Sequence, residues 1–185
     1  MRIISGKFKG AKLFSPKNSR IRPTSDRARE MIFDTLNSIL LSRKKKFTQI
    51  NVLDGFCGTG ALGIESLSRG SNSVTFIDLS KKSLELTRKN CENLNLLSCC
   101  SFVKMDLTKI NKEIKTFDLF FLDPPYFGNV IDISLNNIAN SKWIKKHSLG
   151  VIEVGKNQKL IIPDSMKLIK KKQVSSSLFY FLIKL

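Results

Sequence analysis

Short apolar stretches alternate with helical patterns from Ile50 onward, and this alternation limits the fold more than any other feature of the chain. The stretches "INVLD", "SVTFID", "CSFVKMD" and "FDLFFLD" have the length of strands, and the last is almost wholly apolar, as a strand buried on both faces should be. Helical patterns cover 61–69, 81–94 and roughly 130–145. Strands that alternate with helices predict an α/β fold with a doubly wound sheet.

The C-terminal part departs from this alternation. After "LGVIEV" the chain finishes with "MKLIKKK" and "SSSLFYFLIKL", which are separated by too few residues for a crossover helix. These two strands are therefore predicted to pair as an antiparallel hairpin, a detail that counts against a plain dehydrogenase fold.

The N-terminal part is predicted to be a small extension. Residues 2–14 alternate as a β-hairpin that turns at Lys9-Gly10, and "RPTSDRARE" leads into a helix of about four turns. The candidates for the helix cap are Thr24, Ser25 and Asp26. We expect one domain, residues 1–185, with the extension in 1–45 and the core in 50–185.

The chain is strongly basic. Its 185 residues include 32 Lys and Arg against 15 Asp and Glu, which gives a net charge of +17. Such an excess favours polyanionic partners, because each phosphate neutralised by Lys or Arg releases condensed counterions. A genome biased toward Lys codons would produce the same excess, so charge alone favours nucleic acid only modestly.

Cysteine usage and the N-terminus indicate a cytoplasmic protein. The four cysteines form no CxxC pair and the single His147 offers no zinc set, so no metal site is expected. "MRIISGKFKGAK" lacks the apolar centre of a signal peptide, and no apolar run is long enough to cross a bilayer. We expect a monomer in a reducing compartment, without a membrane partner.

"LDGFCGTGALGIE", at 53–65, holds Gly58-x-Gly60-x-x-Gly63 between a predicted strand and a predicted helix. In a dinucleotide site this turn binds a pyrophosphate at the helix N-terminus. Asp54, just before the turn, suits a cation better, and S-adenosylmethionine (AdoMet) has an ammonium and a sulfonium but no phosphate. The stretch by itself favours AdoMet over NAD and leaves both open.

Acidic residues at the ends of the next two strands complete the expected cofactor site. Asp78 can accept hydrogen bonds from the ribose hydroxyls of either cofactor, and Asp106 can bond the adenine amino group. The full expected set is Asp54, Phe56, Cys57, Gly58, Gly60, Asp78, Leu79, Asp106 and Leu107.

"FFLDPPYFG" ends the fourth predicted strand with four residues that we expect to be catalytic: Asp123, Pro124, Pro125 and Tyr126. Ligand sites in open α/β sheets lie beyond the carboxyl ends of strands, so this tetrapeptide should lie beside the glycine turn. The prolines fix the backbone and leave carbonyl oxygens free to accept hydrogen bonds. A carboxylate, a rigid carbonyl and an aromatic face suit an exocyclic amino group on a planar base.

In these motifs the chain resembles the RsmD family, AdoMet-dependent enzymes that methylate N2 of a guanine in bacterial 16S ribosomal RNA. The resemblance rests on "MRIISGKFKGAKL", "RPTSDRARE", "LDGFCGTGALGIESLSRG" and "FLDPPY", and it covers residues 1–126. Cys57, Thr59 and Asp78 stand where Ala, Ser and Glu are commoner, with size or charge preserved. The resemblance implies a Rossmann-like class I methyltransferase fold, AdoMet as cofactor and the small ribosomal subunit as partner.

The chemistry then expected at the fourth strand is positioning of an amine. Hydrogen bonds from its N–H groups to the Asp123 carboxylate and the Pro124 carbonyl would localise the nitrogen lone pair, and Tyr126 would stack on a base rotated out of the RNA. The expected RNA-binding residues are Arg2, Lys7, Lys9, Lys12, Arg22, Thr24 and Arg27. Helix capping explains Thr24 and Asp26 about equally well, and a solvated surface would explain the lysines, including Lys170–Lys172.

Two other functions stay open at this stage. A DNA adenine-N6 methyltransferase also carries Asp-Pro-Pro-Tyr, but 185 residues leave little room for a target-recognition segment. A non-catalytic RNA-binding or ribosome-assembly protein would explain the charge but not the acid-proline-proline-aromatic set.

Overall fold

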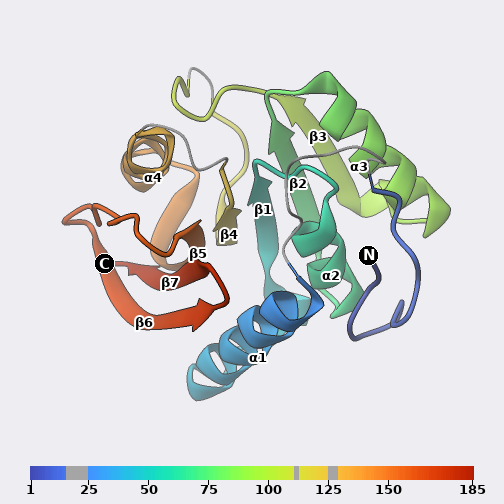
Figure 1. Ribbon diagram of the computed structural model, residues 1–185, viewed down its shortest axis with the longest axis horizontal. Coiled ribbons are helices and arrows are strands. Elements are labelled where there is room, and N and C mark those ends of the chain that lie inside the picture. The colour runs from blue at the N-terminus through green and yellow to red at the C-terminus, as the bar shows by residue number, and fades with distance from the viewer. Residues whose placement is uncertain (16–24, 111–112, 125–128) are drawn as a thin grey trace.

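A seven-stranded sheet forms the centre of the molecule in the computed structural model, which describes residues 1–15, 25–110, 113–124 and 129–185 (Figure 1). The strand order is β3-β2-β1-β4-β5-β7-β6, with all neighbours parallel except those of β7. The strands are β1 (Asn51–Gly55), β2 (Ser73–Asp78), β3 (Cys100–Lys104), β4 (Phe117–Leu122), β5 (Ile144–Gly155), β6 (Met166–Val174) and β7 (Ser177–Lys184). The predicted α/β doubly wound fold and the antiparallel C-terminal hairpin are confirmed.

The described helices cover both faces of the sheet unequally. They are α1 (Asp26–Ser42), α2 (Ala61–Ser68), α3 (Lys81–Asn93) and α4 (Val130–Asn140), with short 3-10 turns η1 (Phe47–Gln49) and η2 (Leu97–Cys99). Phe121 of β4 shares one apolar cluster with α1, α2 and α3, whereas its neighbour Phe120 shares the other cluster with α4. The two phenylalanines belong to different clusters because successive side chains of a strand point to opposite faces of the sheet. None of the helices in these ranges is long and apolar enough to span a membrane.

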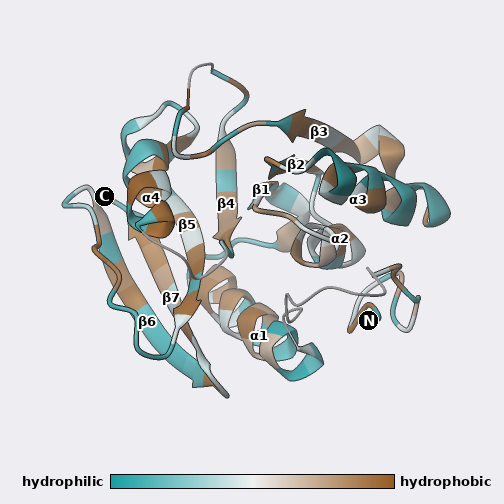
Figure 2. Cartoon of the chain, turned by 45° about the horizontal axis from the view of Figure 1, so that its top comes forward, coloured by the Kyte–Doolittle hydropathy of each residue, from teal (hydrophilic) through white to brown (hydrophobic). Residues whose placement is uncertain are grey.

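The outer edge strand β6 is hydrophilic, in contrast to the buried strand β7 beside it (Figure 2). Its exposed lysines are Lys167, Lys170, Lys171 and Lys172. Charged side chains on an edge strand discourage pairing with the sheet of another molecule, which accounts for these lysines without a ligand.

Helix α1 begins where the cap candidates predicted it. The Ser25 hydroxyl accepts a hydrogen bond from the Ala28 N–H at 3.2 Å, so Ser25 is the cap. The buried face of the helix includes four residues that recur at helical spacing in the sequence, Ile32, Leu36, Ile39 and Leu40, and also Phe33.

Arg29 lies on this same buried face and is fully buried. Its Nη2 donates to the Arg2 carbonyl and to Asp26 Oδ1, both at 2.7 Å, and its Nη1 lies 3.8 Å from Glu65 Oε2 on α2. Glu65 is itself fully buried and also accepts from the Ile4 N–H. The two buried charges thus join the N-terminal segment, α1 and α2. Each keeps a second ionic partner, Asp26 for Arg29 and Arg69 for Glu65, so the four side chains form one network.

The predicted N-terminal hairpin is only partly formed. A single antiparallel bridge joins Arg2 to Lys12, and no strand is assigned in residues 1–15. The backbone instead bonds to α2: the Lys7 N–H donates to the Ser68 carbonyl at 2.8 Å, and the Ile4 and Ser5 N–H groups donate to Glu65. Because these donors are used by the helix, they are not available for a β-ladder.

The predicted helix at 130–145 was too long. Helix α4 ends at Asn140, and Ile144 already pairs with Phe117 as the first residue of β5. Trp143 between them is fully buried in the cluster beneath α4, so tertiary packing ends the helix at a position that local periodicity does not mark.

Candidate active site

The register of the sheet brings the expected cofactor and catalytic residues to one edge. Gly55 at the end of β1 pairs with Ile77 of β2 on one side and with Leu122 of β4 on the other. The next residues, which include Asp78 and Asp123, therefore lie along the same edge. Because neighbouring strands are about 4.8 Å apart, the Asp78 and Asp123 backbones are about 10 Å apart, with the glycine turn between them.

The three glycines of the turn have different roles. A Cβ on Gly60 would lie 2.5 Å from Thr87 Cγ2, and one on Gly63 would lie 2.4 Å from Phe76 Cε1. These two glycines let α2 pack against β2 and α3. A Cβ on Gly58 would face open space, with its nearest contact at 3.9 Å, so Gly58 leaves room for a ligand close to the backbone.

Phe56 marks the turn as strained. Its φ is +59°, in the left-handed region that a bulky side chain rarely adopts. Such a conformation costs roughly 1–3 kcal/mol and persists only where the surrounding structure enforces it, which is common at ligand sites.

Asp54 lies beneath the turn and is 3% exposed. Its Oδ2 accepts a hydrogen bond from the Gly63 N–H at 2.9 Å, which caps helix α2, since the glycine at its N-terminus has no side chain to do so. Burial raises the pKa of Asp54 to about 7; the Gly63 bond opposes this effect and the charge of Asp78 adds to it. A cation near Asp54 would favour its ionised form.

Asp78 ties the turn to the end of β2. Its Oδ2 accepts from the Gly58 N–H at 3.0 Å and its Oδ1 from the Ser80 N–H at 2.8 Å. Each carboxylate oxygen can accept a second hydrogen bond, so the group can still receive hydroxyl donors. Leu79 beside it is 61% exposed and offers an apolar surface to a planar ring.

The remaining expected cofactor residues differ in environment: Asp106 is hydrogen-bonded after β3, whereas Leu107 and Cys57 are buried. Asp106 Oδ1 accepts from the Thr108 hydroxyl at 2.7 Å and from its N–H at 2.9 Å, and these bonds hold the pKa of Asp106 below its ordinary value. Leu107 is 1% exposed and packs in the core under Gly55, so its side chain does not reach the edge. Burial raises the pKa of the Cys57 thiol, which argues against a nucleophilic role.

Asp123 and Pro124 follow β4 directly; Asp123 is partly exposed and Pro124 is buried. Pro125 and Tyr126 lie outside the described residues, as do Arg22 and Thr24. Within the described ranges no group of three or more His, Cys, Asp or Glu could hold a metal ion.

Glu153 is an acidic residue at this edge that the sequence interpretation missed. Leu122 pairs with Ile152, so Glu153 of β5 lies beside Asp123, and it is 7% exposed. The available indication was a carboxyl group inside the apolar run "VIEV". Arg29 was missed as well, although it lies three and four residues before Ile32 and Phe33 on the apolar stripe of α1.

The basic residues expected to bind RNA are exposed, namely Arg2, Lys7, Lys9, Lys12 and Arg27. The Arg2 Nε lies 3.3 Å from Asp26 Oδ2, so part of its charge is used within the protein. The N-terminal segment runs along α2: Met1 Sδ is 3.7 Å from the Thr59 hydroxyl at one end, and Lys7 bonds Ser68 at the other. Since α2 is about 12 Å long, Lys7 lies roughly that far from the glycine turn.

The strand order, the glycine turn after β1 and the acid after β4 together define the class I AdoMet-dependent methyltransferase fold. The family model described as conserved hypothetical protein 95 matches residues 1–183, and the chain belongs to this family, the RsmD family. The resemblance drawn from the sequence motifs is thereby confirmed.

Named relatives and a solved structure agree with this assignment. The chain is 34% identical to the ribosomal RNA small subunit methyltransferase D of Buchnera aphidicola, over 92% of this chain and 86% of that protein. It is also 34% identical to the protein of the same name from Haemophilus influenzae, over 93% and 88%. A solved structure from Escherichia coli superposes with a TM-score of 0.85 at 25% identity, covering 100% of this chain and 97% of that one.

Proposed function

We propose that this protein transfers a methyl group from AdoMet to the exocyclic N2 amine of a guanine in 16S ribosomal RNA, in the cytoplasm. The observation that carries the proposal is the alignment of Asp78, the glycine turn and Asp123 along one edge of the sheet. The relatives named ribosomal RNA small subunit methyltransferase D support the same substrate class.

The residues beside the turn fit AdoMet better than a dinucleotide. Gly58 leaves open space at the backbone, Asp78 presents a carboxylate for ribose hydroxyls, and Leu79 offers an apolar surface for adenine. Asp54 suits a cationic amino acid end and opposes a pyrophosphate. When bound, AdoMet supplies an already activated, electrophilic methyl group.

The protein's own contribution to the reaction is then positioning and charge stabilisation. The guanine amine is a poor nucleophile because its lone pair is delocalised into the ring. The Asp123 carboxylate and the Pro124 carbonyl would accept hydrogen bonds from its two N–H groups, which localises the lone pair and stabilises positive charge that develops on nitrogen. As the N–C bond forms, the C–S bond breaks and the donor leaves as a neutral thioether; the methylated nitrogen then loses one proton to solvent. In this proposal Pro125 stiffens the loop and Tyr126 stacks on the base.

A single assay separates this function from its alternatives. The protein would be incubated with labelled AdoMet and, in parallel, unmethylated small subunits, free 16S ribosomal RNA and DNA. The modified nucleoside would be identified by digestion and mass spectrometry. We expect N2-methylguanosine in the RNA of one or both ribosomal substrates.

Other products of that assay would contradict the proposal in distinct ways. N6-methyladenine in DNA would identify a DNA adenine methyltransferase. RNA binding without incorporation of label into any substrate would identify a non-catalytic assembly factor.

A further inference from the structure

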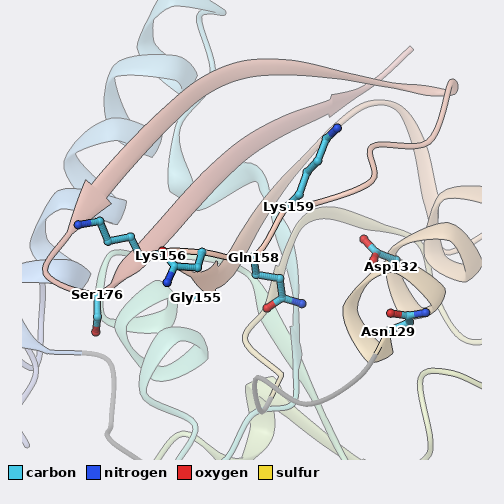
Figure 3. A pocket seen from close by; sticks show the side chains of 8 residues that line it. Asn129, Asp132, Gly155, Lys156, Gln158, Lys159 and Ser176 are labelled. Carbon is cyan, nitrogen blue, oxygen red and sulfur yellow. The ribbon is translucent and has the colours of Figure 1, made fainter.

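A hollow lies beyond the carboxyl end of β5, apart from the glycine turn. It has a volume of about 750 Å³ and is bounded by the start of α4 and the turn after β5 (Figure 3). Gln158 on the turn faces Asn129 and Asp132 across it. The residues that line it include Asn129, Asp132, Gly155, Lys156, Gln158 and Lys159.

The sheet places this hollow next to Asp123, on the side away from the glycine turn. Leu122 pairs with Ile152, so Glu153 lies beside Asp123 and Gly155 lies two residues, about 7 Å, further along β5. The order of strands β1-β4-β5 therefore places the glycine turn, Asp123 and the hollow in a row.

The turn that carries the hollow is held in place by the rest of the fold. The Lys156 N–H donates to the Ser176 carbonyl, and the Gln158 N–H donates to the Gly155 carbonyl, both at 2.9 Å. On the opposite side Asp132 Oδ1 accepts from the Ile161 N–H at 2.9 Å. The backbone is thus organised before any ligand binds, which lowers the entropic cost of binding.

The side chains on this turn are available to a ligand. Lys156 and Lys159 are exposed, and Gln158 is partly exposed. Within the described part of the chain, these three side chains make no hydrogen bond or ion pair. They project from a rigid support with their polar groups still to be paired.

The chemistry of the hollow fits one nucleotide of a nucleic acid strand. Carboxamides such as those of Asn129 and Gln158 can donate and accept at once, as the edge of a base requires. Lysine ammonium groups pair with phosphates. Two lysines against the single carboxylate of Asp132 leave the hollow with a net positive charge, and Asp132 can accept from a base amino group.

We propose that this hollow is a nucleotide subsite that holds the RNA residue next to the methylated guanosine. Lys156 and Lys159 contact its phosphates, while Asn129 and Gln158 bind the edge of its base. The assignment rests on the proposed function, since it takes the target amine to lie at Asp123.

The test compares two variants that each remove two positive charges. Lys156→Ala with Lys159→Ala changes the hollow, whereas the control, Lys45→Ala with Lys46→Ala, changes two exposed lysines before β1, at the opposite edge of the sheet. RNA affinity would be measured by anisotropy across a salt series, with KM, kcat and AdoMet affinity determined in parallel.

For the hollow variant we expect RNA affinity to fall at least tenfold and KM for RNA to rise accordingly. The slope of log affinity against log salt should decrease by about 1.4, since each contact to a single strand contributes about 0.7. AdoMet affinity and kcat at saturating RNA should stay at the wild-type values, and the control should behave as wild type.

Gln158→Ala tests the contact to the base separately. We expect a several-fold rise in KM, weaker discrimination against RNA altered at the neighbouring nucleotide, and an unchanged salt slope. The subsite is wrong if the hollow variant and the control give the same slope and KM. A wild-type protein that binds RNA but methylates none overturns the proposed function instead, and the salt slopes then still decide whether the hollow binds RNA.

Discussion

The proposed active site lies along one edge of the sheet, and its two halves, on either side of Asp123, are built in different ways. On the half that is proposed to bind AdoMet (the cofactor half), Asp54, Asp78 and Asp106 all accept hydrogen bonds from nearby backbone N–H groups, so their positions are set without a ligand. On the half beyond β4, Lys156 and Lys159 are exposed side chains on a braced turn. Carboxylates held in fixed positions bind a small cofactor of constant shape at a lower entropic cost. A long polyanion is instead bound by many adaptable charges.

Among substitutions that test this difference between the two halves, we expect Asp123→Ala to have the largest effect on activity. Removal of an acceptor used mainly in the transition state should lower kcat by on the order of a hundredfold or more and leave AdoMet affinity nearly intact. Asp78→Ala should do the opposite and weaken AdoMet binding first. Single-turnover rates and calorimetry would measure the two quantities.

Asp123→Asn sharpens the same test, because Asn keeps a carbonyl acceptor and should retain part of the activity. Methylation at the wild-type rate by Asp123→Ala under saturating AdoMet would remove Asp123 from the reaction.

Two glycine substitutions should separate folding from ligand binding within the cofactor half. In Gly63→Ala the new methyl group would lie 2.4 Å from Phe76 Cε1 and 2.8 Å from Val74 Cγ1, so the free energy of unfolding should fall by about 1–3 kcal/mol. In Gly58→Ala the methyl group enters open space, so only the left-handed backbone conformation of this residue should lower the free energy of unfolding, by about 1 kcal/mol. AdoMet affinity should nevertheless drop at least tenfold in Gly58→Ala. Urea unfolding and calorimetry on both variants would check this, and full AdoMet affinity in Gly58→Ala would place the cofactor elsewhere.

The stability of the protein should depend on pH through Asp54. Its pKa of about 7 in the folded protein lies above the ordinary 3.8, so between these values the folded state holds a proton that the unfolded state has lost. Wild-type stability should therefore fall relative to Asp54→Asn as pH rises from about 4 to 7, by up to roughly 1.4 kcal/mol per pH unit, and level off above 7.

Urea unfolding at a series of pH values would measure this dependence. Asp34→Asn, an exposed position on α1, is the matched control and should follow the wild-type curve. Parallel curves for Asp54→Asn and wild type would show that Asp54 ionises in the folded protein as it does in the unfolded chain.

The smallest effect is expected at the N-terminal segment, where Lys7, Lys9 and Lys12 are exposed. Replacement of all three by Ala should flatten the salt dependence of RNA affinity, by up to about 2 in slope if each contacts one phosphate. AdoMet affinity should not change. An unchanged slope in the triple variant, together with a reduced slope in the Lys156 and Lys159 variant, would move the RNA surface to the β5 side of the edge.

Much of this protein could be predicted from its sequence because the decisive features are local. The strands and helices of the core, the Ser25 cap and the short link before the final strand each depend on a few neighbouring residues. They agree with the structure, apart from the C-terminal end of α4. The glycine turn and the acid after β4 could likewise be located, since the carboxyl ends of parallel strands share one edge.

Other features depend on contacts between distant segments, and only the tertiary structure decided them. Arg29 is buried because Asp26 and Glu65 offset its charge, and Glu65 is 36 residues away in the sequence. The N-terminal segment forms one bridge rather than two strands because α2 takes its backbone donors. The hollow beside Asp123 exists because β5 is the neighbour of β4, which brings Gln158 opposite Asn129. Local patterns carry no information on such pairings, since each requires the folded sheet to bring its partners together.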